Sequence, residues 1–181
     1  MIYTGIGSRE TPKEVLDCFV RIGKYLAEQK WVLRSGGASG ADSAFESGCN
    51  MVLNGPKEIY LPWKGFNNNP SKLYNIPNDI QQQARLIAQQ VHPNWERCSE
   101  GAKKMHTRNV HQILGYWLNS PTDVIICWTP NGSGSGGTGQ ALRIAKQYNI
   151  PIFDAGSYKE LIDFRRDLFN FIKNIKETEK W

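Results

Sequence analysis

Two glycine-rich segments of the sequence have the composition of loops that hold phosphate groups. The first, residues 31–48, reads WVLRSGGASGADSAFESG, and the second, residues 129–139, reads TPNGSGSGGTG. Glycine has no Cβ, so the backbone of such a loop can adopt positive φ and approach a bound group closely. Each segment follows an apolar run and leads into a predicted helix, whose first N–H groups are unpaired and favour anionic oxygens.

The first segment also has a purely structural interpretation. A tight strand-to-helix turn needs the same glycines without a ligand, and an isolated glycine motif is weak evidence. Asp42, in the first turn of the helix predicted from Ala41, can either cap the N–H donors itself or hydrogen-bond a ribose. The sequence leaves both interpretations open, and the presence of a second glycine segment favours a ligand.

The residues around the glycines exclude two common classes of phosphate-binding enzyme. Ser35 replaces one glycine of the dinucleotide fingerprint, and the next strand ends at Leu61, Pro62 and Trp63 without the acid that binds ribose. Residues 129–139 lack the lysine that a nucleoside-triphosphatase loop places against the β- and γ-phosphates. Neither a nicotinamide-dependent dehydrogenase nor an ATP hydrolase is therefore expected.

The cysteines and histidines predict neither a metal nor a cofactor. The four cysteines form no CxxC pair: Cys18, Cys49, Cys98 and Cys127. Disulfides are not expected in a chain of this size and compartment. His106 and His111 are five residues apart, so they do not share one helical face as metal ligands would.

Length and composition predict one globular domain spanning residues 1–181. Hydrophobic residues make up 40% and charged residues 22%, which is ordinary for a soluble protein. No run is long and apolar enough for a membrane span, and no secretory signal is seen, so a cytoplasmic location is expected. The net charge of +5 favours an anionic partner, but the only local basic cluster is Lys103, Lys104 and Arg108.

The order of the elements predicts the fold class. Helices are expected at about 12–29, from 41 to the stop at 54–56, and at 78–90, 99–118, 140–148 and 161–175, and residues 176–181 are expected to fray. Strands are expected at 2–4, 31–33, 58–62, 123–128 and 149–153. This alternation is typical of an α/β fold with a doubly wound, mostly parallel Rossmann-like sheet and helices on both faces. Ligands of such sheets bind beyond the carboxyl ends of the strands.

Five motifs together resemble one superfamily. GSRETP, LRSGGASGADSAFESG, EIYLPW, the TRN of residues 107–109, and GSGGTGQALRIA resemble, in this order, the superfamily of DNA-processing protein A and LOG proteins, called SLOG. The resemblance covers residues 1–154. It implies a Rossmann-like fold that binds nucleotides, nucleotide-derived signals or single-stranded DNA. It also implies that Arg108, in the RN motif, contacts a phosphate; pairing with Glu100 or covering an apolar face is the alternative.

Comparison with the same superfamily predicts that this chain is not an enzyme. The LOG branch cleaves nucleoside monophosphates with a PGGxGTxxE motif, and this chain has Arg143 where that glutamate is expected. We therefore predict no catalytic residue. The favoured function is non-enzymatic sensing or sequestering of a small nucleotide-derived ligand, such as an ADP-ribose-type or cyclic nucleotide signal of antiviral defence. Single-stranded DNA binding and nucleoside monophosphate phosphoribohydrolase activity are the alternatives, and a homo-oligomer is expected.

The predicted ligand site gathers the loops at the carboxyl edge of the sheet. Trp63 and Trp128 follow strand ends, where they can stack on a base or wall the core. The predicted ligand-binding residues are Gly7, Ser8, Arg9, Ser35, Gly36, Gly37, Ala38, Gly40, Asp42, Trp63, Arg108, Asn109, Trp128, Thr129, Gly136, Gly137, Thr138 and Gln140.

Overall fold

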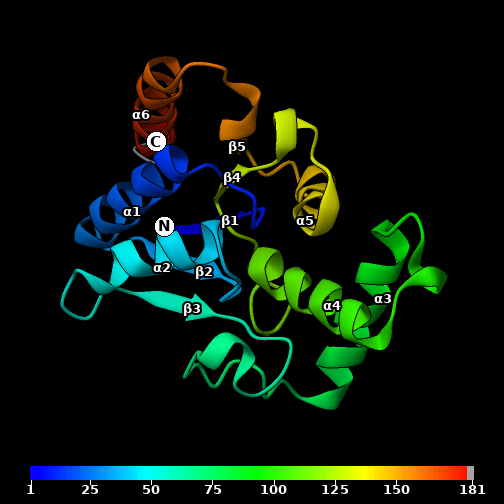
Figure 1. Cartoon of the computed structure of the whole chain (residues 1–181). Helices are drawn as coiled ribbons and strands as arrows, with labels where there is room; N and C mark the ends of the chain where they lie inside the picture. Colours follow the sequence, from blue (N-terminus) through cyan, green and yellow to red (C-terminus); the bar gives the residue numbers. More distant parts are fainter. Residues whose placement is uncertain (179–181) are drawn as a thin grey trace.

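The computed structural model describes residues 1–178 and contains a five-stranded parallel sheet (Figure 1). The strands lie in the order β3-β2-β1-β4-β5, and every neighbouring pair is parallel. Their bounds are β1 Ile2–Gly7, β2 Val32–Ser35, β3 Lys57–Ile59, β4 Val124–Trp128 and β5 Ile152–Asp154. The predicted α/β class with a Rossmann-like parallel sheet is confirmed.

Six helices lie on the two sides of the sheet (Figure 1). On one face lie α1 (Lys13–Glu28), α2 (Ala41–Asn50) and α6 (Leu161–Thr178). On the other lie α4 (Glu100–Leu114) and α5 (Gly136–Gln147), and α3 (Asn78–Val91) packs against them on the side away from the sheet. Short 3₁₀ turns occur at Phe66–Asn68, Trp95–Arg97, Pro130–Gly132 and Ala155–Ser157.

The two faces of the sheet form separate cores, and β4 contributes to both. Val124 and Ile126 are buried in the core beneath α1, α2 and α6, whereas Ile125 and Cys127 are buried in the core beneath α3, α4 and α5. Side chains of a strand alternate between its faces, so a strand covered on both sides is apolar throughout. This is why the uninterrupted run VIICW predicts a central strand.

The strand order reverses beside β1. The chain moves outward from β1 through β2 to β3, and then crosses back to place β4 on the other side of β1. The two strands end together, because Gly7 pairs with Trp128. The loops after β1 and β4 therefore diverge from one point at the carboxyl edge of the sheet, which is where ligands bind in open α/β sheets.

Several predicted helix bounds were wrong. The helix predicted to reach residue 118 ends at Leu114, because Gly115 adopts a φ of 79° that ends the α-helical path. The helix predicted from residue 140 begins at Gly136, since the Ser135 carbonyl already accepts a bond of 3.1 Å from the Gly139 N–H. Similarly, α2 ends at Asn50, before the predicted stop at residues 54–56.

The end of β1, the N-cap of α1 and the end of α6 also differ from the prediction. Strand β1 continues to Gly7, because its end pairs with β4. Pro12, rather than Thr11, is the N-cap of α1, and the Thr11 hydroxyl donates to the Ser8 carbonyl instead of capping the helix. Helix α6 continues to Thr178, beyond the predicted end at residue 175, and the remainder of the tail predicted to fray, residues 179–181, lies outside the described residues.

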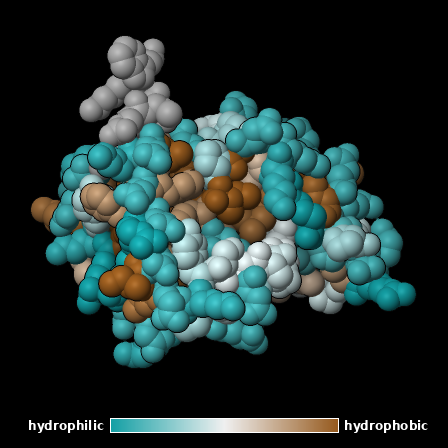
Figure 2. Space-filling view, turned by 90° about the horizontal axis from the view of Figure 1, so that it is seen from above, coloured by the Kyte–Doolittle hydropathy of each residue, from teal (hydrophilic) through white to brown (hydrophobic). Residues whose placement is uncertain are grey.

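The surface seen from above is mostly hydrophilic, and its hydrophobic residues form separate groups (Figure 2). Within residues 1–178, no helix combines the length and the apolar composition that crossing a bilayer requires. The homo-oligomer expected from the sequence stays a prediction.

Candidate functional site

A cavity of about 520 Å³ opens at the point where β1 and β4 end. This volume falls in the range of small-molecule sites. Its walls come from the loop after β1, the beginning of α2, one face of α4 and the beginning of α5. The lining residues are Ile6, Gly7, Ser8, Arg9, Glu10, Ala38, Asp42, Met105, His106, Arg108, Asn109, Gln112, Pro130, Ser135, Gly136, Gly137, Thr138 and Ala141.

The N-terminus of α5 borders this cavity. Residues 136–138 form the first turn of the helix, so their N–H groups have no partner within the helix. A Cβ added at Gly136 or Gly137 would meet no atom within 4 Å, so open space lies next to both glycines. A helix of 12 residues that begins in this way offers aligned N–H donors and partial positive charge to an anion.

The loop that leads into α5 is fixed by the protein rather than free. The Thr129 N–H donates to Asp154 Oδ1 over 2.9 Å, and the Thr129 hydroxyl donates to the other carboxylate oxygen of Asp154. Thr129 Oγ1 in turn accepts a bond of 2.9 Å from the Gly134 N–H. Thr129, a predicted ligand residue, therefore anchors the loop and does not line the cavity.

The loop after β1 forms the opposing part of the cavity wall. The Ser8 N–H donates to the Trp128 carbonyl over 3.1 Å, which ties this loop to the end of β4. Ser8 Oγ accepts a bond of 3.1 Å from the Glu10 N–H, and Ser8 lines the cavity. Arg9 is exposed and adds a positive charge at the same rim.

Arg108 is buried and hydrogen-bonds to the first glycine turn, residues 36–40, which connects β2 to α2. Its Nη1 donates to the carbonyls of Gly36 and Tyr60, the latter over 3.3 Å. A Cβ at Gly36 would clash with that nitrogen, so a larger residue there would have to displace the Arg108 guanidinium. Burial lowers the pKa of Arg108, the charge of Asp42 opposes this effect, and the nearby Arg9 lowers the pKa further. Arg108 does not pair with Glu100, which contacts Arg85 and Lys103 instead.

Asp42 caps the N–H donors of the first glycine turn. Its carboxylate accepts a bond of 3.1 Å from the Gly36 N–H and further bonds from the backbone of Ala38 and Gly7. Burial raises the pKa of Asp42 to about 6, although Arg108 and these backbone donors pull it down. Asp42 therefore binds donors of the turn and of β1 rather than capping the first turn of α2, and its contact with a ribose stays a prediction.

Asn109 links the second glycine segment to α4. Its side-chain amide donates to the Gly137 carbonyl and to Gln140 Oε1, each over 3.1 Å. Its Oδ1 accepts a bond of 3.1 Å from Arg108 Nε. Neighbouring residues of α4 thus hold both glycine segments, Arg108 through Gly36 and Asn109 through Gly137.

Ten predicted ligand residues line the cavity and eight do not. The ten are Gly7, Ser8, Arg9, Ala38, Asp42, Arg108, Asn109, Gly136, Gly137 and Thr138. Ser35 donates to the Gly5 carbonyl, Gly36 packs on Arg108, Thr129 holds Asp154, and Gln140 accepts from Asn109. Gly37 and Gly40 adopt φ values of 62° and 88° in the turn before α2. Trp63 packs edge-on against Phe66, and Trp128 packs against the α1 side of the sheet.

Sequence reasoning missed several residues of the cavity. Met105 and Gln112 share a face of α4 with Arg108, and this i, i+3, i+7 spacing could have identified them. Glu10 adjoins the predicted Arg9. The remaining missed residues are Ile6, His106, Pro130, Ser135 and Ala141.

No protein-family model and no curated protein matches the chain. Among solved structures, that of DNA processing protein A from Helicobacter pylori is similar, with a TM-score of 0.48 and 16% sequence identity. The match covers 85% of this chain and 64% of that chain, so this chain spans less than two thirds of its length. The work on that protein describes its binding of single-stranded DNA. A likeness of this degree bears on neither the ligand nor the activity of this chain.

Proposed function

We propose that the cavity binds a small, phosphorylated, nucleotide-derived ligand and releases it chemically unchanged. The observation that carries this proposal is the meeting of the α5 N-terminus and the Arg9 side chain in one cavity at the switch in strand order. Backbone N–H groups and a guanidinium are the usual partners of phosphate oxygens. Ile6, Met105 and Ala141 supply apolar wall on which a base or ribose can rest.

The carboxylates at the cavity support binding without turnover. Within the described chain, the acids that line it are Glu10 and Asp42. Asp42 is occupied by backbone donors and faces Arg108. Arg143, which stands where the LOG glutamate is expected, donates its Nε–H to the Val91 carbonyl over 2.7 Å.

The distribution of positive charge supports a small ligand over a polymer. Of the basic cluster in the sequence, Lys103 is 14% exposed and ion-paired with Glu100, Arg108 is buried, and Lys104 is exposed. A single-stranded nucleic acid needs a basic groove that follows its backbone. Lys103 and Arg108 are therefore poorly placed to contribute to such a groove.

A ligand of the proposed class is expected to raise the thermal stability of the chain. A ligand present at a hundred times its dissociation constant adds about 2.7 kcal/mol to the free energy of unfolding. Thermal unfolding with inorganic phosphate, a nucleoside monophosphate, ADP-ribose and a cyclic dinucleotide tests this, and chromatography of the recovered ligand tests turnover. Absence of stabilisation by every compound would contradict the proposal, as would protein-dependent release of a base.

Replacing Gly137 with valine is expected to abolish binding without loss of stability. The new side chain would extend into the open space before the first turn of α5, where the phosphate oxygens are proposed to lie. Gly101→Val is the matched control, because Gly101 is the second residue of α4, as Gly137 is of α5. A Cβ added at Gly101 would have only Ser99 Oγ within 4 Å, and Gly101 does not line the cavity. Calorimetric titration should show lost binding only for Gly137→Val; equal binding by both variants would place the ligand elsewhere.

Titration with a labelled single-stranded oligonucleotide at two salt concentrations separates the small ligand from DNA. Each phosphate contact with a single strand adds about 0.7 to the slope of log affinity against log salt. We expect weak binding at moderate salt. Tight binding with a steep slope would instead favour single-stranded DNA as the ligand.

A further inference from the structure

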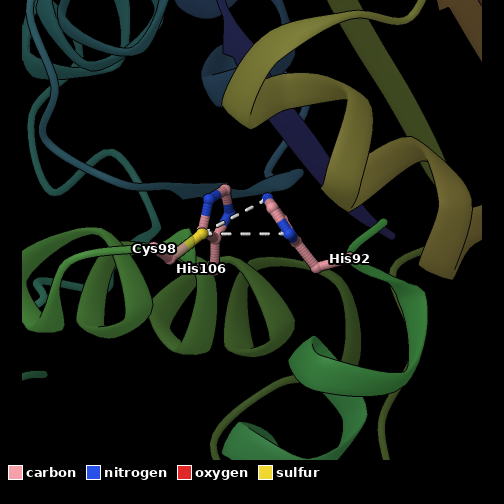
Figure 3. A group of neighbouring side chains, drawn as sticks. All are labelled: His92, Cys98 and His106. Carbon is pink, nitrogen blue, oxygen red and sulfur yellow. Dashed lines mark hydrogen bonds between the residues drawn. The ribbon is translucent and has the colours of Figure 1, made fainter. Parts of the chain in front are cut away.

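Three side chains with metal-binding atoms meet beside the cavity (Figure 3). His92, Cys98 and His106 each offer one ligand atom, and these atoms lie within 4.8 Å of one another. Cys98 Sγ is 3.8 Å from both ring nitrogens of His92, and the two imidazole rings are 4.4 Å apart. All three residues are half-buried, so the cluster borders solvent.

The connection between α3 and α4 brings these side chains together. His92 ends α3, Pro93 and the turn Trp95–Arg97 reverse the chain, and Cys98 precedes the N-cap of α4. The buried Trp95 fixes this turn, with its ring 6.1 Å from that of His92 and 6.5 Å from that of His106. The cluster therefore stands on two helices joined by a packed turn.

We propose that His92, Cys98 and His106 bind one divalent ion of the zinc class. Zinc takes imidazole nitrogen at about 2.0–2.1 Å and thiolate sulfur at about 2.3 Å. In a tetrahedral arrangement these lengths place ligand atoms roughly 3.5 Å apart. The separations of 3.8 Å and at most 4.8 Å need only a small closure to reach that geometry.

The ligand set discriminates between classes of ion. Thiolate and imidazole select zinc and similar borderline ions, whereas magnesium and calcium require oxygen ligands. His106 Nδ1 is buried, and no residue among 1–178 satisfies it with ordinary hydrogen-bond geometry, although the Gln140 side chain lies nearby.

Two of the three side chains, His92 and Cys98, make weak contacts with the backbone when no metal is bound. The Asn94 N–H donates to His92 Nδ1 over 3.2 Å, and the Cys98 thiol is 3.6 Å from the Asn94 carbonyl. Binding of the ion would replace these weak contacts and release the thiol proton. Three protein ligands leave one tetrahedral position for water or another ligand atom. The zinc site does not require the phosphate site, so either can fail alone.

Metal titration of the untagged full chain tests the site. We expect one Zn²⁺ per chain, measured against a chromophoric chelator, and a thiolate-to-metal charge-transfer band with Co²⁺. Cys98→Ser and His92→Ala should each weaken zinc binding more than ~100-fold, since changes to outer-shell partners alone cost 10–100-fold. Cys18→Ser is the control, because Cys18 is buried on α1 beside Arg165. Circular dichroism in chelator checks that each variant is folded.

Alkylation of the native chain gives a test that needs no variant. Cys98 is half-buried, whereas Cys18, Cys49 and Cys127 are buried, so iodoacetamide should modify Cys98 first. Stoichiometric Zn²⁺ should slow that modification at least tenfold, as measured by peptide mass spectrometry. Equal rates with and without zinc, absence of the cobalt band, or full zinc affinity in Cys98→Ser would overturn the proposal.

Discussion

Replacing Arg108 with alanine is expected to lower the free energy of unfolding by about 1–3 kcal/mol, the usual cost of leaving a buried hydrogen-bond acceptor without its donor. The guanidinium is buried, donates to the carbonyls of Gly36 and Tyr60, and offsets the charge of Asp42. Its loss leaves these carbonyls without their donor and Asp42 without its countercharge. Urea denaturation at pH 7 measures the effect.

Arg9→Ala provides the matched comparison for Arg108→Ala. It removes the same charge from the same cavity, but Arg9 is exposed. We expect its stability to change by no more than ~0.5 kcal/mol, and its ligand binding to weaken by about 1.5–3 kcal/mol, the value of a hydrogen bond to a charged group. If Arg108→Ala instead keeps its stability and loses only binding, then Arg108 serves the ligand and not the fold.

The stability of Asp42→Asn relative to the unchanged chain is expected to rise by on the order of 3 kcal/mol between pH 4 and pH 7. Burial raises the pKa of Asp42 from 3.8 to about 6. Between these values the folded chain binds the proton and the unfolded chain does not. Stability from this group is therefore present at low pH and is lost as the pH rises toward 6. Asparagine, which does not ionise, avoids that loss.

Paired urea denaturations at pH 4, 5, 6 and 7 measure this difference, and the other titrating groups largely cancel between the two proteins. Asp17→Asn, at an exposed position of α1, controls for the removal of one negative charge. A fall in the relative stability of Asp42→Asn with rising pH would mean that attraction to Arg108 outweighs the burial of the carboxylate.

The order of apolar and polar residues along the chain was sufficient to predict the fold class and the edge of the sheet where the loops gather. The apolar run of β4 and the alternation of helices with strands predict a parallel sheet covered on both faces. A strand that is buried on both faces is apolar throughout, and a helix that is buried on one face is apolar at every third or fourth residue. Residues 7–9 and 136–138 were predicted at that edge for the same reason, since each group follows a strand of this sheet. Both groups line the cavity.

Which side chains meet could not be predicted from the sequence, because it depends on how the elements pack. The spacing of residues predicts which of them share a face of one element, whereas the bond from Arg108 of α4 to the Gly36 carbonyl joins two elements. In the same way, the spacing of His92, Cys98 and His106 matches no familiar metal motif, and their contact depends on how the turn at Trp95 packs. The turn at Gly36 was predicted to hold phosphate. In the structure its N–H donates to the carboxylate of Asp42 instead.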